Sequence, residues 1–96
     1  MMSDQDINEA VARKLGWTHG WGEHGYHERY PDYCTSIAAA WEIVEKLKLD
    51  GYSFDIISYK GGGFNASFWR TPDENKAGEL ADTAPMAVCL AYLKLP

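Results

Sequence analysis

The strongest hydrophobic pattern in the chain lies in the stretch TSIAAAWEIVEKLKL, residues 35–49. Apolar residues recur there at three- and four-residue spacing, which places them on one stripe of an α-helix whose other sides are charged. Thr35 or Ser36 can cap the start, and Asp50-Gly51 provides a common stop. We predict a helix that supplies the largest part of the core, with Trp41 at the centre of a buried stripe made of Ile37, Ala40, Trp41, Val44 and Leu47.

A second amphipathic pattern lies near the start of the chain, opened by Asp4 or Asp6. Acidic residues stand early and basic residues late in this stretch, which suits the helix dipole. Gly16 then provides a typical helix stop. We predict a first helix that packs through the apolar positions Ile7, Val11 and Leu15, which are four residues apart.

The last apolar run, from Met86 to Leu93, has no clear polar face. Asp82 or Thr83 can cap it, and Pro85 is tolerated in a first turn because the N–H that proline lacks would have no partner there. A helix that is apolar on nearly all sides is buried on more than one of them. We expect cover either from within the domain or from another subunit, most simply in a symmetric homodimer.

Two runs between these helices, YSFDIISY (52–59) and FNASFWR (64–70), are rich in β-branched and aromatic residues and flank a glycine-rich turn. They predict an antiparallel hairpin. Apolar side chains fall on both of its faces, so both faces should be covered. Residues 71–82 contain four acids, a glycine and a proline and are predicted to be an exposed loop. Residues 17–33 have no helical period and are predicted to be an ordered irregular segment or a short strand.

These elements predict a single domain over residues 1–96 of the mixed α/β (α+β) class. Its small antiparallel sheet should carry helices on both faces, in the order helix, irregular segment or short strand, helix, strand, strand, helix. A chain of 96 residues that is 46% hydrophobic can fill one core.

Composition and charge narrow the range of functions. The apolar runs are far shorter than the roughly 20 residues that a membrane span needs. The opening MMSDQDINEA lacks the basic start and apolar middle of a secretory signal, so we expect a cytoplasmic protein that does not bind membranes. Fourteen acidic against nine basic residues give a net charge of −5, and the bases are scattered. Nucleic-acid binding needs a clustered basic face and is therefore disfavoured.

The residue types that bind metals gather in one segment, where His19, His24 and His27 are interleaved with Glu23 and Glu28. Zinc accepts imidazole and carboxylate ligands, but structural sites hold them at characteristic spacings, and H-x4-H-x2-H is not one of these. We predict a polar surface loop, with neither a metal nor another cofactor.

The two cysteines, Cys34 and Cys89, lack a CxxC spacing and are expected to be reduced and buried. Cys34 with one of the three histidines could supply a nucleophile and its base. No motif adds a third member or an oxyanion hole. The alternative function that these residues leave open is a small metal-dependent or thiol hydrolase that uses the 19–34 segment.

Five aromatic residues in the same region form a further candidate site. Tyrosine and tryptophan are enriched at interface hot spots because they bury large areas with few rotatable bonds. These rings either complete the core or form a protein-binding surface. The candidate partner-binding residues are Trp17, Trp21, Tyr26, Tyr30 and Tyr33.

Three stretches of the chain resemble one known family. They are VARKLGW at 11–17, TSIAAAWEIVEKLKLDGYSFDI at 35–56 and ADTAPMAVCLAYL at 81–93. Together they resemble the phage ABA sandwich domain, a group of small phage and prophage proteins. The resemblance implies an α/β/α layered domain carried on phage genomes or integrated elements, and it supplies no catalytic residues. We therefore expect an accessory protein that acts without catalysis, by contact with an unidentified protein partner or as a homodimer.

Overall fold

The computed structural model describes residues 2–16, 21–22, 25–26, 30–71 and 75–96. The sheet β3-β4-β5 is an antiparallel meander, and β1 and β2 pair separately with each other. The mixed α+β class with an antiparallel sheet is thus confirmed. The elements follow in the order α1 (Asp4–Leu15), β1 (Trp21–Gly22), β2 (Gly25–Tyr26), α2 (Ile37–Leu49), β3 (Ser53–Ser58), β4 (Phe64–Arg70), β5 (Asn75–Ala81) and α3 (Ala84–Lys94).

The helix ends follow from short polar side chains and one glycine. Before α1, Ser3 and Asp6 form a capping box in which each side chain accepts the other residue's backbone N–H. Ser36 and Thr83 cap α2 and α3 more simply, and the side chain of each accepts one backbone N–H. Gly16 ends α1 in the left-handed conformation, with a φ of 108°. The predicted helices therefore begin and end close to where their capping residues indicate.

A tight turn joins β3 to β4 and sets their register. The N–H of Tyr59 donates to the carbonyl of Gly63 at 3.1 Å, and the N–H of Gly62 donates to the carbonyl of Tyr59 at 2.9 Å. Gly62 and Gly63 have φ values of 106° and 93°, which glycine adopts without the steric penalty of a side chain. The resulting register places Phe54 opposite Phe68.

The third strand, β5, lies within the segment 71–82 that was predicted to be a loop, so that prediction is wrong. Ala77 and Ala81 are half-buried against the core, whereas Gly78 and Leu80, which point to the other face, are exposed. Glu79 lies on the same face as these alanines but forms an ion pair with Lys94 of α3. The strand pattern is present, but small alanines and intervening charges hide its apolar face.

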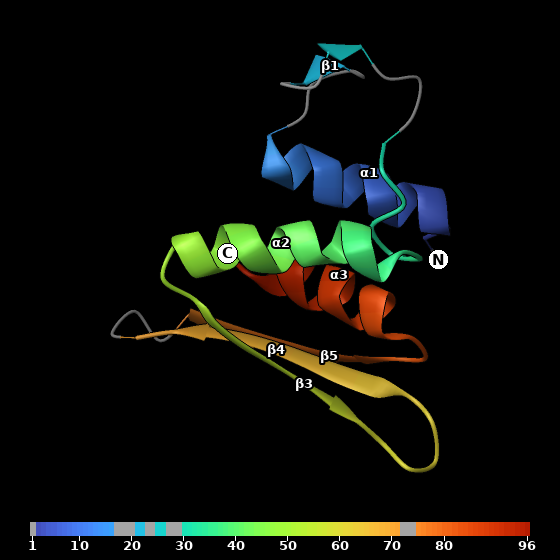
Figure 1. The fold of residues 1–96 in the computed structure, drawn as a ribbon, viewed down its shortest axis with the longest axis vertical. Helices are drawn as coiled ribbons and strands as arrows, with labels where there is room; N and C mark the ends of the chain where they lie inside the picture. Colours follow the sequence, from blue (N-terminus) through green and yellow to red (C-terminus); the bar gives the residue numbers. More distant parts are fainter. Residues whose placement is uncertain (1, 17–20, 23–24, 27–29, 72–74) are drawn as a thin grey trace.

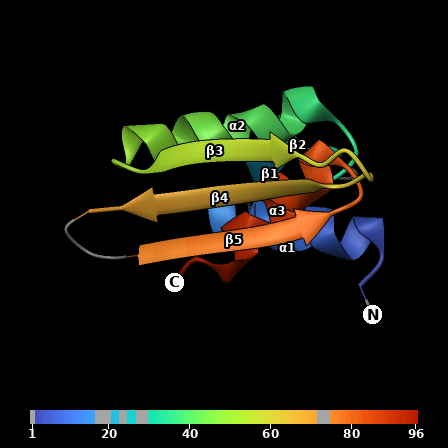
Figure 2. The same ribbon diagram turned by 90° about the horizontal axis from the view of Figure 1, so that it is seen from below.

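All three helices lie on one face of the sheet, which corrects the prediction of helices on both faces. Figure 1 shows the sheet as the lowest layer, α2 and α3 above it, and α1 beyond them. Figure 2, seen from the side of the sheet, shows no helix in front of the strands. The other face carries Ile57, Trp69 and Leu80 as exposed residues. The apolar residues that suggested a second helical layer therefore lie on an open face in the described part of the chain.

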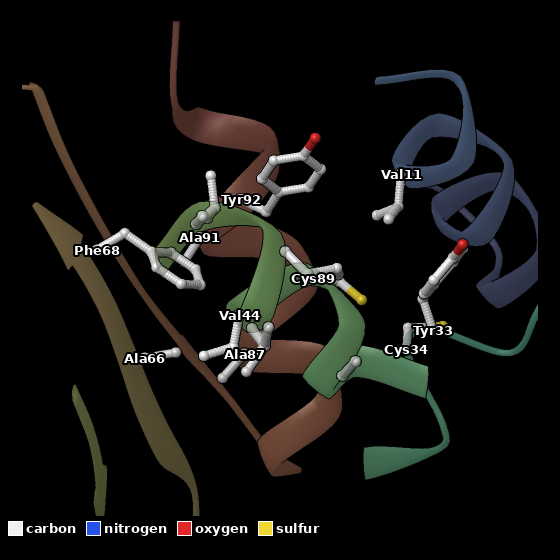
Figure 3. Packing of buried hydrophobic residues seen from close by; sticks show 14 of the residues in the cluster. Val11, Tyr33, Cys34, Val44, Ala66, Phe68, Ala87, Cys89, Ala91 and Tyr92 are labelled. Carbon is white, nitrogen blue, oxygen red and sulfur yellow. The ribbon is translucent and has the colours of Figure 1, made fainter. Parts of the chain in front are cut away.

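The core is centred on α3, not on α2 as predicted. α3 packs over β4 and β5 on one side and against α2 and α1 on others, which explains why it has no polar face. This cover comes from within the domain, so the fold does not need a second subunit at α3. Figure 3 shows the packing. The buried residues include Val11 of α1, Val44 of α2, Phe68 of β4, and Cys89 and Tyr92 of α3.

Trp41 is not in the core, which corrects the predicted stripe of α2. Its exposed fraction is 45%, and that of Ile37, one turn earlier, is 52%. The residues that α2 buries are instead Ala40, Ile43, Val44 and Leu47. Both sets satisfy helical spacing. The choice between them depends on where α3 lies relative to α2, because α3 provides the larger surface against which α2 packs.

Candidate protein-binding surface

The aromatic residues predicted to bind a partner are only partly described. Trp17 lies outside the described residues, and so do the side chains of Trp21 and Tyr26. Tyr30 is half-buried and packs against the core. Tyr33 has an exposed fraction of 1%, so its assignment to a surface is wrong. The last ring of the series completes the core beside α1.

The same segment holds the residue types that bind metals. His19, His24, His27, Glu23 and Glu28 all lie outside the described residues. Within the part of the chain that the structure does describe, no group of three or more histidine, cysteine, aspartate or glutamate side chains could hold a metal ion. The prediction of a surface loop without a metal stays a prediction.

Cys34 lies in an environment that does not suit a nucleophile. The side chain is buried, its Sγ donates to the carbonyl of Asp4 at 3.5 Å, and its N–H donates to the Oδ1 of Asn8 at 2.9 Å. Burial raises the pKa of the Cys34 thiol, and the Asp4 carboxylate raises it further. A thiol nucleophile needs a lowered pKa, because the thiolate is the reactive form. The described contacts assign Cys34 a packing role, and the predicted burial of both cysteines is confirmed.

The basic side chains nearest the end of α3 serve the fold. The Nζ of Lys14 donates to the carbonyl of Tyr92 at 2.7 Å and to that of Leu95, and it lies over the Tyr92 ring. Arg70 lies over the Tyr52 ring and donates to the backbone carbonyl of Asp50 at 3.1 Å. These contacts cap α3 and join β4 to the end of α2. Lys14 and Arg70 therefore stabilise the fold of the domain.

An apolar surface lies where α2 meets the edge strand β3. We call Ile37, Trp41, Phe54 and Ile56 the edge patch. The Trp41 ring meets the Phe54 ring edge to face with centroids 5.9 Å apart, and Phe54 packs on Phe68 with centroids 5.0 Å apart. Ile37, Trp41 and Ile56 are exposed, whereas Phe54 is half-buried. The patch is thus an outward extension of the core.

The backbone of β3 adds hydrogen-bonding groups to this patch. The N–H of Tyr59, directly after β3, donates to the carbonyl of Gly63, directly before β4. In an antiparallel ladder such pairs alternate, so every second residue before Tyr59 also directs its N–H and carbonyl toward β4. The residues between them direct these groups away from β4, toward the free edge. Phe54, Ile56 and Ser58 are therefore the outward-facing backbone positions of β3.

Acidic side chains border the edge patch. Glu42 and Glu45 on α2 and Asp55 on β3 are exposed and form no ion pair with another described residue. Lys46 of α2 is already paired with Asp50 at 3.1 Å. Around the helix, Glu42 points about 100° away from Trp41, whereas Lys48, seven residues after Trp41, lies on nearly the same side. Glu45 and Asp55 together outweigh this one base, so the surroundings of the patch carry a small net negative charge.

The open face of the sheet offers a second, more polar surface. Ser67, Trp69 and Gly78 of this face line a hollow of about 620 Å³ at the β5 side of the sheet, to which Lys76 also contributes. The side-chain amide of Asn65 donates to the hydroxyl of Ser67 at 3.0 Å on this face. Apolar and polar positions alternate here, so the apolar surface is interrupted.

Sequence reasoning missed the edge patch because it placed Trp41 in the core and covered both faces of the sheet. A signal was present in SFDIIS, residues 53–58. This strand has two adjacent isoleucines, which must point to opposite faces. It contains neither lysine nor proline, the residues that usually protect an edge strand from pairing.

The fold and this surface define a small α+β domain in which three helices cover one face of a three-stranded sheet and leave an apolar edge exposed. The chain belongs to the phage ABA sandwich domain family, whose match covers residues 6–93. The family resemblance of the sequence is thereby confirmed. Comparisons with curated proteins and with solved structures gave no match. Among the described helices, none combines the length and apolar character that crossing a membrane requires.

Proposed function

We infer that this chain is a small phage or prophage accessory protein that acts in the cytoplasm by contacting another protein, without catalysis. Membership of a phage domain family supports the first part. The exposed edge patch carries the second, because a tryptophan held by a second ring at the surface is the kind of anchor that dominates protein interfaces.

The position of Trp41 supports binding better than stability. A ring that served the fold alone would gain more by turning into the core, where burial of an aromatic side chain contributes most. Trp41 instead remains 45% exposed while its edge contact with Phe54 fixes its orientation. A rigid, half-exposed ring loses little conformational entropy when a partner covers it.

Affinity capture from lysates of a phage-bearing host tests this function. Trp41→Ala removes the anchor, and Leu49→Ala is the matched control, since Leu49 lies on the same helix with an exposed fraction of 89%. We expect one protein to be recovered with the wild type and the Leu49 variant and to be depleted with Trp41→Ala, measured by quantitative mass spectrometry. Equal recovery with all three would remove the edge patch as the binding surface.

A homodimer is the other form that protein contact can take. Light scattering over a concentration series measures it directly, because one chain has a mass of 10.8 kDa. We expect this monomer mass at high micromolar concentration, since α3 is already covered within the domain. A mass near twice that value would show that a second copy is the partner.

A further inference from the structure

We propose that the partner supplies an extended segment that pairs with β3 as a fourth strand and lies under α2, with apolar residues facing α2 and basic residues facing the open side. This proposal rests on the proposed function and specifies the mode of contact and the chemistry of the partner segment.

The widths of the two layers leave room for this strand. A helix with its side chains is about 10 Å wide, roughly the width of two strands at about 4.8 Å each. Two helices side by side therefore cover about four strands, and the sheet has three. Because α3 packs over β4 and β5, α2 extends past β3, as Figure 2 shows. The uncovered place lies next to β3, under the side of α2 that carries Trp41.

The edge of β3 can accept the strand. Its outward-facing backbone groups are those of Phe54, Ile56 and Ser58, which alternate with residues bonded to β4. An added antiparallel strand would exchange hydrogen bonds with these three residues without disturbing the β3–β4 ladder. The required backbone geometry is therefore already formed, and no strand of the described chain occupies it.

Side chains determine what the partner strand should carry. On the helix side, its residues would lie beside Phe54 and Ile56 and under Trp41, which favours isoleucine, valine or leucine. On the open side, they would lie beside Asp55, which stands between Ser53 and Ile57 on that face of β3. The carboxylate of Asp55 favours lysine or arginine at the alternate positions. The partner segment is thus an alternating apolar and basic strand.

A second copy of this chain fits the place poorly. Two copies that paired through β3 around a two-fold axis would place that axis about 2.4 Å outside β3, half of one strand spacing. α2 already extends over this position, so the two α2 helices would overlap. The pairing would also bring the Asp55 side chains of the two edge strands into one small sheet region, where their like charges repel. A segment without a helix of its own, and of opposite charge, avoids both conflicts.

A fluorescein-labelled peptide of alternating lysine and isoleucine, KIKIKIK, serves as the probe in fluorescence anisotropy. We expect a dissociation constant on the order of 10–100 µM, weakening with added salt because the surroundings of the patch carry net negative charge. In an antiparallel pair the isoleucines, which share the helix side with Ile56, would direct their N–H groups toward β3. N-methylation of the isoleucines should therefore abolish binding, whereas N-methylation of the lysines should change the affinity by less than about twofold.

Two protein variants provide the matching test on the other side. Ile56→Pro removes an outward N–H and places the proline ring on the free edge without removing a β3–β4 hydrogen bond. Leu80→Pro makes the same change at an outward position of β5. We expect Ile56→Pro to weaken peptide binding by about tenfold or more and Leu80→Pro to leave it within about twofold. Circular dichroism confirms that each variant is folded.

Several results would overturn strand addition. They are equal binding of both methylated peptides, no binding of KIKIKIK up to about 1 mM, or a dimer that Ile56→Pro dissociates. The proposed function fails separately. If the wild type captures no protein from the lysate, protein contact itself is refuted. If Ile56→Pro captures the same protein as the wild type, the proposed protein contact is supported, but strand addition through β3 is refuted.

Discussion

The two edges of the sheet differ in how they are protected. On the β5 edge, Lys76 lies at an outward-facing position, and the nearby Glu79 forms an ion pair with Lys94 of α3. Lysines and charges near an edge strand are common devices against unwanted pairing, and α3 also packs over this side. The β3 edge has neither a lysine nor a proline within Ser53–Ser58 and carries exposed Ile56 and Ile57. One sheet thus has an edge strand that carries a lysine and lies under α3, and an edge strand whose only charged residue is Asp55 and whose two isoleucines are exposed.

Both edge strands are hydrogen-bonded to the central strand β4. Phe68 of β4 is fully buried and packs on Phe54, so Phe68→Ala should lower the free energy of unfolding by about 3–5 kcal/mol. Trp69→Ala, at the next residue, removes a partly exposed ring from the open face and should cost much less. Urea denaturation measures both. Equal costs would show that the two faces of the sheet do not differ as described.

Alkaline pH should weaken the α3 side, which protects β5. Burial raises the pKa of Cys89 to about 12 and the pKa of Tyr92 to about 12. In the unfolded chain these groups ionise at lower pH, near 9 for the thiol and near 10 for the phenol. The unfolded state therefore loses protons first, and stability falls as the pH rises from about 9 toward 12. Urea midpoints at a series of pH values should show the decrease, and Cys89→Ala should make it shallower.

The β3 side should depend less on its exposed ring. Trp41→Ala removes the edge contact with Phe54 but leaves the buried residues of α2 in place, so we expect a loss of about 1 kcal/mol in unfolding free energy. A thermal melt alongside Leu49→Ala, which should be nearly silent, measures this. A loss of stability as large as that caused by Phe68→Ala would show that Trp41 is buried in the core.

The smallest effect should come from the charge pair on the β5 edge. Lys94→Ala removes the ion pair with Glu79, whose lysine is largely exposed, so stability should change by less than about 1 kcal/mol. The change should shrink further in high salt. A large, salt-independent loss would mean that Lys94 contributes by packing along its aliphatic chain and not by charge.

The local elements could be predicted from the sequence, but their arrangement could not. Caps, glycine stops and helical periodicity place α1, α2 and α3, because these signals act within a few residues. β5 was missed because Ala77 and Ala81 contribute little hydrophobic signal and become informative only beside α3. The buried side of α2 was misassigned because two stripes fit the same spacing, and only the position of α3 selects between them.

The candidate site could be predicted from the sequence even less well than the arrangement of the elements. Aromatic content drew attention to Tyr33, but content alone does not tell a surface ring from a core ring, and Tyr33 is buried. The edge patch joins α2 to β3 through Trp41 and Phe54, which are separated by a turn and belong to different layers. Such a site exists only once the layers are assembled.

The position of α3 along the chain has a consequence for how the domain forms. The helix that contacts α1, α2, β4 and β5 follows all of them in sequence. During synthesis the earlier elements emerge before the surface on which they pack, so they can hold only local structure until α3 leaves the ribosome. We therefore expect folding to occur in one cooperative step after residues 84–94 are available. A nascent chain released before that point should be degraded by proteases, and the exposed edge of β3 should remain unformed until the whole domain closes.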